Sequence, residues 1–445
     1  MSLADQASLL FIPSGYKSQK VYSIFPTDGD GDFDFLRSGS ATRIAKNGLI
    51  TTVDSNVPRL EYPLIDGVVN GCPSLKLEPQ RTNLLPYSED FSNAAWGKYN
   101  TTLQSNQVIS PDGTLNADIL FETSDNNFHF IFDAISSLAN TEYNFSIFVK
   151  KLNRRYVGIQ GFNSLNKGSI AFFDLDNGTL EYEFSEGTGY SVSDAKIEKY
   201  PNGWYRLSAN FTAPDTEIYM GLCLADERWS SGTAYDNTYS GDITKGVYIW
   251  GAQIEQGSYP TSYIPTNGST VTRNAETCNG AGDAATFNDS EGVLMAEISA
   301  LANDLTYRSI GLNSGSATNR LLLTFNNVSN NINFLIQVGG VTQVNINYAS
   351  ANITSNNNIA LKYKLNDFAL WVNGFEVGTD TSGNVFPINT LNNVSFDNSN
   401  AADNFYGNTK QVQYYNSALT DSELEQLTSW TSFSDMANGQ QYSII

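Results

Sequence analysis

Residues 143–149 read YNFSIFV, and this stretch decides the fold class. Its apolar and polar residues alternate with a period of two, which is the pattern of a β-strand. Other stretches of this kind are separated by turn signals such as Asn202-Gly203 and Asn373-Gly374, which favour the positive φ angles of tight hairpins. These further stretches are 246–250, 321–325 and 368–372. We therefore expect an all-β protein with many short strands.

One segment departs from the strand pattern. Residues 420–427 read TDSELEQL, in which Thr420 and Glu423 have the spacing of a capping box. The apolar residues that follow are spaced as in a short amphipathic helix. We expect one short helix here and very little helix elsewhere.

The composition excludes several classes of partner. The chain has 445 residues, and 25 lysines and arginines against 46 aspartates and glutamates give a formal net charge of −21. Such a chain repels phosphate backbones, and no basic cluster offsets this locally, so we expect no nucleic-acid partner. No apolar run approaches the roughly 18–20 residues of a membrane-spanning helix. Residues 1–15 lack the basic start of a signal peptide, and we expect no membrane insertion.

Composition also divides the chain into five regions. The first is rich in Gly, Asp and Arg and lacks long strand patterns, so we expect an irregular N-terminal segment. Two blocks of strand patterns follow, separated by a polar linker and followed by a tail. The boundaries are 1–79 for the segment, 80–270 for the first block, 271–284 for the linker, 285–432 for the second block and 433–445 for the C-terminal tail. The expected architecture is two jelly-roll or β-sandwich domains in tandem.

The residues that most often carry catalysis or bind metals are scarce. The three cysteines are widely spaced and odd in number, so they form neither a zinc pattern nor a disulfide framework. A single histidine, His129, excludes a metal centre built from several histidines. It lies in a strand-like stretch, where we expect a structural role. Trp204, Trp250 and Trp371 also lie in strand patterns, and we expect them in cores.

The first block resembles a module that is common in bacteriophage virion proteins, including tail fibres and head fibres. The resemblance is carried by RTNLLPYSEDFSNAAW at 81–96, NGWYR at 202–206 and VYIWGAQIEQGSYPTSYIPT at 247–266. That module is similar to carbohydrate-binding jelly rolls. Upstream, SGSATR at 38–43 and LEPQRTNL at 77–84 look like the segment that usually precedes it. The resemblance implies a carbohydrate-binding-module-like jelly roll in a phage particle.

The second block resembles the laminin-G/concanavalin A-like lectin sandwich. Residues 368–377, FALWVNGFEV, look like a hairpin of that family, and residues 407–424, GNTKQVQYYNSALTDSEL, look like its last strand and closing turn. The same sandwich hosts lectins, hydrolases and plain spacers. It therefore indicates the fold and leaves the function open.

Aromatic residues next to polar ones give the candidate sugar site. Sugar binding in a sandwich needs flat aromatic faces beside amide and carboxylate groups. Residues 227–239, ERWSSGTAYDNTY, offer both on an expected loop. The candidate carbohydrate-binding residues are Trp229, Tyr235, Asp236, Asn237 and Tyr239. The alternative is that they cover the end of a barrel or face a neighbouring subunit.

Two sets of acidic residues are candidates for Ca²⁺, which takes several oxygen ligands. The run 27–34 places four carboxylates within seven residues but lacks the last Glu of an EF-hand loop, and a solvated acidic turn is the alternative. By resemblance, jelly rolls often hold a structural Ca²⁺, which implies a second set near the joined ends of the first block. The candidates are Asp28, Asp30, Asp32 and Asp34 in the run, and Glu89, Asp118 and Glu255 in the block. The expected function requires no cofactor.

The resemblance implies a structural subunit of a bacteriophage fibre or appendage. Such a subunit is made in the cytoplasm of the bacterial host and displayed on the surface of the phage particle. We expect weak, multivalent binding to cell-surface or environmental glycans and a homo-oligomer, most simply a trimer. Residues 1–79 are expected to contact other virion proteins, where Arg37, Arg43 and Arg59 could dock to carboxylates.

Two alternatives remain open. A polysaccharide-degrading depolymerase would need two carboxylates about 5 Å or about 6.5–9.5 Å apart. The chain lacks the Glu-x-Asp-x-x-Glu run of concanavalin A-like glycanases, so we expect no enzymatic activity. The second alternative is a purely architectural capsid or tail decoration protein, whose block ends would be filled by protein contacts.

Overall fold

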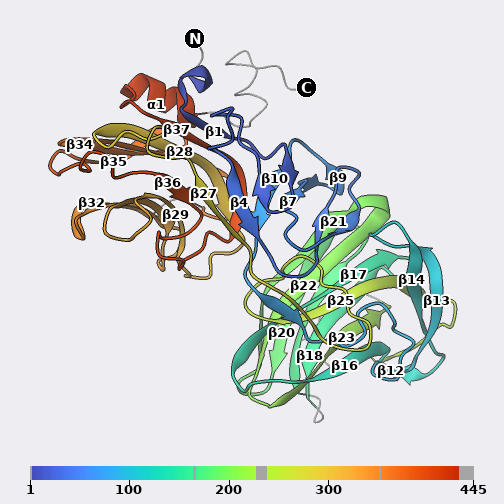
Figure 1. Ribbon diagram of the computed structural model, residues 1–445. Helices are drawn as coiled ribbons and strands as arrows, with labels where there is room; N and C mark the ends of the chain where they lie inside the picture. Colours follow the sequence, from blue (N-terminus) through green and yellow to red (C-terminus); the bar gives the residue numbers. More distant parts are fainter. Residues whose placement is uncertain (1–2, 164–166, 227–237, 350–351, 430–445) are drawn as a thin grey trace.

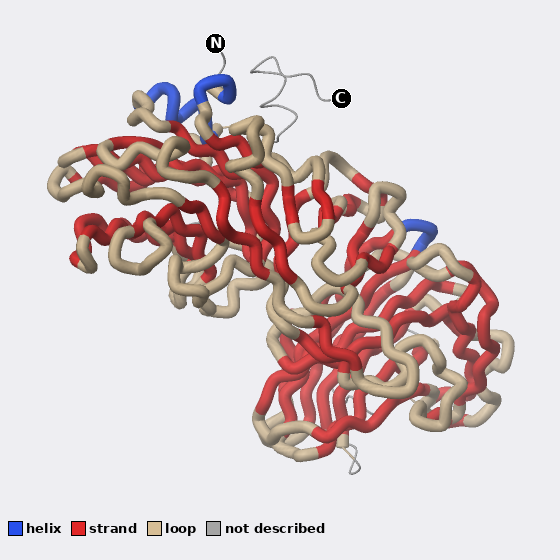
Figure 2. The backbone as a smooth tube through the Cα atoms, in the orientation of Figure 1, coloured by secondary structure: helices blue, strands red, loops and turns tan. Residues whose placement is uncertain are grey.

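The computed structural model of the protein describes residues 3–163, 167–226, 238–349 and 352–429. It confirms the all-β class, because antiparallel strands make up nearly all of the regular structure. Figure 1 shows two β-sandwiches, the first in cyan to green and the second in gold to red, with the blue N-terminal segment between them. The same layers of strands are visible in red in Figure 2.

The first sandwich consists of two six-stranded sheets. One sheet has the order β12 (Gly97–Tyr99), β16 (Phe130–Ser136), β23 (Glu217–Ala225), β18 (Tyr156–Phe162), β19 (Gly168–Asp174) and β20 (Thr179–Glu186). The other has the order β13 (Thr101–Ile109), β14 (Leu115–Glu122), β25 (Gly246–Gln256), β17 (Thr141–Lys151), β22 (Trp204–Ala213) and β21 (Ser191–Tyr200). Two-residue strands β15 (Asn126–Asn127) and β24 (Tyr239–Ser240) pair beside them.

Strand β17 shows how alternation builds this sandwich. Phe145 and Ile147 are fully buried in the core between the two sheets. Phe148 points to the opposite face and packs there against Trp250, with ring centroids 5.3 Å apart. Tyr263 covers this outer cluster, its ring 4.7 Å from that of Trp250. Both faces of β17 are therefore buried, and the segment around Tyr263 closes the outer one.

The second sandwich has one eight-stranded and one nine-stranded sheet. The first sheet has the order β35 (Phe375–Asp380), β34 (Asp367–Val372), β33 (Asn357–Lys364), β28 (Glu291–Ala300), β37 (Gly407–Tyr415), β10 (Ser74–Leu77) and β7 (Arg59–Glu61), and β1 (Leu9–Phe11) also pairs with β37. The second has the order β2 (Tyr16–Lys17), β3 (Lys20–Val21), β4 (Phe33–Leu36), β27 (Thr277–Ala281), β36 (Asn393–Ser395), β29 (Arg308–Asn313), β30 (Arg320–Phe325), β31 (Ile332–Val338) and β32 (Val341–Tyr348).

The N-terminal segment corrects one expectation. Residues 1–79 were expected to be irregular, but six of their strands complete the two sheets of the second sandwich. Leu9, Phe11, Phe33 and Leu75 are fully buried in its core. The strands are two to four residues long, and β1, β4 and β10 each pair with a strand hundreds of residues away, as Leu9 does with Tyr414. Local periodicity cannot reveal such pairs.

The expected linker at 271–284 is also regular structure. Strand β26 (Val271–Arg273) pairs with β11 (Arg81–Asn83), which ties the end of the first block to its beginning. Strand β27 then lies in the middle of the nine-stranded sheet, between β4 and β36. The chain therefore passes between the sandwiches without a free polar linker. Residues 433–445, the expected tail, lie outside the described residues.

Short elements complete the fold. Two hairpins lie in the N-terminal segment, β5 (Ala41–Ile44) with β6 (Ile50–Val53) and β8 (Leu64–Ile65) with β9 (Val68–Val69). Within the described residues, the helices are the 3-10 turns η1 (Ala4–Gln6) and η2 (Pro201–Gly203) and the α-helix α1 (Asp421–Thr428). The expected capping box is confirmed in α1, where Glu423 Oε2 accepts a hydrogen bond from Thr420 N at 2.8 Å.

Two further expectations are confirmed. Asn373 and Gly374 have φ angles of 51° and 88° between β34 and β35, as a tight hairpin requires. Trp204, Trp250 and Trp371 are all buried. Among the described helices, none has the length and apolar character needed to cross a bilayer.

Candidate functional site: a cleft between the two sandwiches

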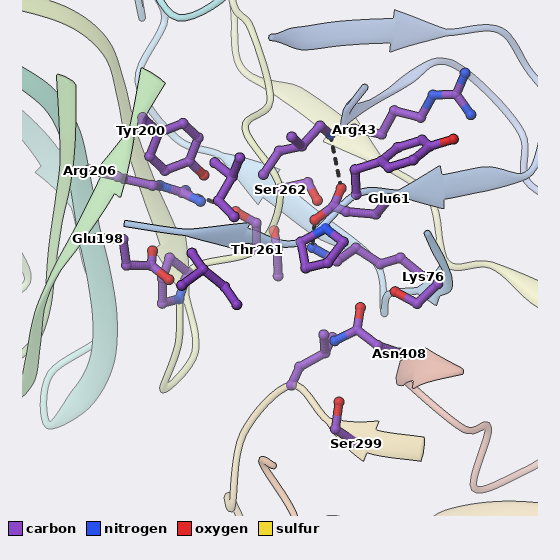
Figure 3. A pocket seen from close by; sticks show the side chains of 18 of the residues that line it. Arg43, Glu61, Lys76, Glu198, Tyr200, Arg206, Thr261, Ser262, Ser299 and Asn408 are labelled. Atoms are coloured by element: carbon purple, nitrogen blue, oxygen red, sulfur yellow. Dashed lines mark hydrogen bonds and ion pairs between the residues drawn. The ribbon is translucent and has the colours of Figure 1, made fainter. Parts of the chain in front are cut away.

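A large cavity lies where the N-terminal segment meets both sandwiches, and its volume is about 1180 Å³. Figure 3 shows that side chains from several regions point into it. Hairpin β5–β6, β7 and β10 line it from the N-terminal segment, β21 and β22 from the first sandwich, and β28 and β37 from the second. We call this cavity the interdomain cleft. Its volume exceeds the roughly 300–1,000 Å³ of small-molecule pockets.

One side of the cleft is held by paired charges. Lys76 on β10 forms an ion pair with Glu61 on β7, and both side chains are largely buried. The other carboxylate oxygen of Glu61 accepts a hydrogen bond from Ile44 N at 3.1 Å. Arg43 lies beside them and donates to the Tyr16 hydroxyl at 3.1 Å, with its guanidinium 5.5 Å from that ring. This wall is therefore ordered by bonds within the N-terminal segment.

The opposite side presents Arg206 on β22, which is 5% exposed. Its Nη2 donates to Ser146 Oγ and to the carbonyl of Thr261, each at 2.9 Å. The Phe148 ring lies 5.6 Å from its guanidinium carbon. Tyr200 also contacts it, and burial raises the pKa of the Tyr200 phenol against the opposing influence of Arg206. The guanidinium is thus fixed in place by uncharged groups.

Beneath the cleft, a buried ion network joins the N-terminal segment to residues 273–276, where the chain passes between the sandwiches. Glu276 is fully buried and accepts from Arg37 Nη1 at 2.7 Å and from Arg59 Nε at 2.8 Å, with a second, short bond from Arg59 Nη2. Arg59 also pairs with Glu78 at 2.7 Å, and Arg273 pairs with Glu78 at 2.8 Å. We call these five residues the junction network. Arg37 and Arg59 therefore meet carboxylates of their own chain, where docking to other virion proteins was expected.

The pKa values in the junction network follow the number of partners. Burial alone would raise the pKa of Glu78, but Arg273 and Arg59 outweigh it and hold this pKa well below its ordinary value. Burial likewise lowers the pKa of a guanidinium, and this wins at Arg37, which faces the single carboxylate of Glu276. Arg59 faces both Glu276 and Glu78, and its pKa is raised.

The cleft also offers polar groups that are free to bind a ligand. The side chains of Asn70, Asn356, Asn408 and Ser299 line it and make no hydrogen bond with the described part of the chain. Tyr62 and Tyr200 are half-buried there. Amide and hydroxyl groups beside aromatic rings are the combination that recognises sugar rings. The cleft can therefore hold a polar, ring-shaped ligand.

The expected sugar-binding loop falls largely outside the described residues. This is so for Trp229, Tyr235, Asp236 and Asn237. Tyr239 is described and is buried, with its hydroxyl donating to Glu122 Oε1 at 2.6 Å. Its ring packs 4.7 Å from that of His129, which is also buried. Tyr239 therefore has no open face for a sugar.

The acidic run at 27–34 does not gather around one point. Asp28 accepts from the backbone of Asp30, Asp32 accepts from Ser23 N at 2.9 Å, and Asp34 pairs with Lys20 at 3.0 Å. In the described ranges, no three His, Cys, Asp or Glu side chains form a group suited to a metal ion. Glu255 lies apart as well, fully buried and bonded to Thr261 N at 2.8 Å.

Glu89 and Asp118 do share a second pocket, of about 470 Å³, on the first sandwich. Burial raises the pKa of Asp118 to about 6, against a hydrogen bond from Asn106 N at 2.9 Å. Burial also raises the pKa of Glu89, whose oxygens accept from Tyr263 at 2.9 Å and Asn116 at 3.0 Å. Two of the three acidic residues that the jelly-roll resemblance implied as Ca²⁺ ligands, Glu89 and Asp118, therefore line the same pocket.

A further surface that sequence reasoning missed is aromatic. Ile131 points from β16 into the core, so the residues flanking it point outward. There Phe130 stacks on Tyr99 at 5.0 Å and meets the edge of Phe162 at 5.6 Å. Phe162 in turn lies 5.4 Å from Tyr219. We call this the aromatic face of the first sandwich.

The cleft itself was also missed, because its residues come from distant parts of the chain. The one local signal is the phrase NGWYR at 202–206, which contains Arg206 and was interpreted only as part of the resemblance to phage virion proteins. A charged residue inside a strand of alternating pattern indicates a partner or a site. Nothing local indicates which residues face it.

Known proteins show only weak sequence and structural similarity to the chain. No protein-family model and no curated protein matches the chain. Among solved structures, the carbohydrate-binding module CBM40 of a Ruminococcus gnavus intramolecular trans-sialidase, bound to α2,3-sialyllactose, is 17% identical, covers 34% of this chain and 93% of its own, and has a TM-score of 0.29. Domains LG4-5 of the mouse laminin α1 chain are 12% identical over 66% and 90%, with a TM-score of 0.23. A Trypanosoma rangeli sialidase is 11% identical over 93% and 78%, with a TM-score of 0.28. These values are too low to assign a family or a ligand.

Proposed function

We propose that the protein is a non-catalytic, glycan-binding subunit of a bacteriophage appendage, and that the interdomain cleft holds the glycan. The observation that carries the proposal is the cleft of about 1180 Å³, with free amide and hydroxyl groups on Asn70, Asn356, Asn408 and Ser299 beside half-buried tyrosines. A sugar ring needs both kinds of contact. The volume of the cleft exceeds that of a typical small-molecule pocket, which suits a ligand of several rings.

The appendage part of the proposal rests on the sequence phrases at 81–96 and 247–266. Fibres display repeated copies, so weak single sites add up to strong attachment. We propose a homotrimer on the surface of the virion. Residues 1–79 would reach other virion proteins through side chains that the second sandwich leaves exposed, such as Val68, which is 67% exposed.

A second candidate, glycan hydrolysis, is favoured by one observation. Glu89 and Asp118 line one pocket, and both have a raised pKa. A carboxyl group with a raised pKa is what the general acid of a glycoside hydrolase requires. If the wild type releases oligosaccharides from bacterial polysaccharide and Asp118→Asn does not, the function is glycan hydrolysis and the non-catalytic proposal is wrong.

The binding proposal is tested with a cleft-filling variant. Asn408→Trp places a large ring in the cleft from β37, and Asn345→Trp on the exposed edge strand β32 is the matched control. On an array of bacterial surface polysaccharides, wild type and Asn345→Trp should bind the same glycans, and Asn408→Trp should lose them. The proposal is contradicted if the wild type binds no polysaccharide on the array, or if Asn408→Trp binds as well as the wild type does. An empty array would instead favour a purely architectural protein.

A further inference from the structure

The charge of the cleft is opposite to that of the chain. Six lysines and arginines line it against four aspartates and glutamates, whereas the whole chain has a net charge of −21. The basic residues are Arg43, Lys76, Lys196, Lys199, Arg206 and Lys410, and the acidic ones are Glu61, Asp66, Glu78 and Glu198. A quarter of all basic residues of the protein thus surround one cavity.

Most of the acidic side chains are already neutralised. Glu61 pairs with Lys76, Asp66 pairs with Lys199 at 3.1 Å, and Glu78 pairs with two arginines of the junction network. Glu198 is the one lining carboxylate that has no ion pair in the described ranges. The cleft therefore presents unbalanced positive charge to a ligand.

Four of the basic side chains have no carboxylate within 4.0 Å among the described residues: Arg43, Lys196, Arg206 and Lys410. Arg206 is the most telling, because it is 5% exposed and its Nε has no hydrogen-bond partner. A buried charge is costly unless it is paired. The guanidinium is held by uncharged groups of Ser146, Thr261, Phe148 and Tyr200, and Figure 3 shows it directed toward the cavity.

We propose that the ligand of the cleft is an anionic polysaccharide, and that an oxyanion on one of its sugars pairs with Arg206. This inference rests on the proposed function and names its substrate class. A guanidinium matches the planar, two-oxygen geometry of a carboxylate or the oxygens of a sulfate or phosphate ester. Lys196 and Lys410 add positive charge at the rim.

The negative charge of the whole chain opposes this binding only weakly at physiological ionic strength. Charges more than about 8–10 Å apart are largely screened there. Contacts inside the cleft act over shorter distances and are screened much less. The local charge therefore decides which polysaccharide enters.

The test compares three probes by isothermal titration calorimetry: polygalacturonate, dextran sulfate and neutral dextran. The wild type should bind an anionic probe and leave dextran unbound. The first two probes separate a carboxylate from a sulfate as the recognised group. Arg206→Gln should weaken anionic binding at least about tenfold, the value of one charge-assisted hydrogen bond.

A second variant guards against a folding defect in Arg206→Gln. The double variant Lys196→Gln/Lys410→Gln changes only side chains at the cleft rim, and it should also weaken anionic binding. Lys364→Gln removes an exposed charge outside the cleft and should bind as the wild type does. Equal binding of dextran and the anionic probes, or unchanged binding by both cleft variants, overturns the inference and leaves the proposed function standing. Absence of binding to all three probes overturns the inference, and an empty glycan array would overturn the proposed function as well.

Discussion

The junction network gives the sharpest prediction about stability, through the substitution Glu276→Gln. Glu276 is fully buried and receives hydrogen bonds from Arg37, from Arg59 and from Glu78 N at 2.9 Å. The substitution keeps the size of the side chain and removes its charge. Two guanidiniums then face an amide group, and the network of three arginines and two glutamates retains one glutamate.

The expected cost is large because no water can reach the unpaired charges. Removing one partner of a buried ion pair typically costs about 3–5 kcal/mol. We expect Glu276→Gln to lower the free energy of unfolding by this amount in urea denaturation, followed by tryptophan fluorescence. The matched control is Glu291→Gln, which breaks the exposed pair with Lys364 and should cost at most about 1 kcal/mol. If Glu276→Gln costs no more than this control, the account of the junction network is refuted.

Other residues give independent predictions. Thr420→Ala should destabilise α1 by about 0.5–2 kcal/mol in urea denaturation, because it removes the capping box, and an unchanged midpoint would refute this. Burial raises the pKa of Asp118 to about 6, so the folded protein holds this proton more tightly than the unfolded chain does. The melting temperature should therefore fall as pH rises from about 4 to 6, and Asp118→Asn should remove that slope. The pKa of Glu78 is lowered instead, so its contribution is complete above its ordinary pKa of 4.5 and is lost as pH falls further; Glu78→Gln should flatten the acid limb of a melting-temperature profile. Gly221→Ala should destabilise the first sandwich, because the new Cβ would lie 2.0 Å from the carbonyl oxygen of Ile131, and a melting temperature equal to that of the wild type would contradict this.

The sequence predicted those parts of the fold that depend on local patterns. Alternation at 143–149 and the Asn373-Gly374 turn each report on neighbouring residues, and both are confirmed. The N-terminal segment was misjudged because Leu9 and Leu75 lie in strands of three and four residues, and their partners lie in β37. Such short strands are stable only through pairing across the chain, which leaves no periodic signal.

The candidate site was less predictable than the fold. Arg206 and Asn408 lie about two hundred positions apart and line one cavity only because the N-terminal segment brings the two sandwiches together. The acidic run at 27–34 had the right composition for a cation, but its carboxylates bond to separate backbone and lysine groups. Composition reports which groups are present, whereas a site depends on where the chain places them.

Hydrogen–deuterium exchange with bound polysaccharide tests the central claim most directly. Saturation with the polysaccharide that binds tightest should slow exchange at 61–76, 196–206 and 407–410, which line the cleft from three regions of the chain. Residues 130–134 and 219–223, in two strands that carry the aromatic face, should exchange as in the free protein. Protection at the aromatic face with no change at the cleft would contradict the account.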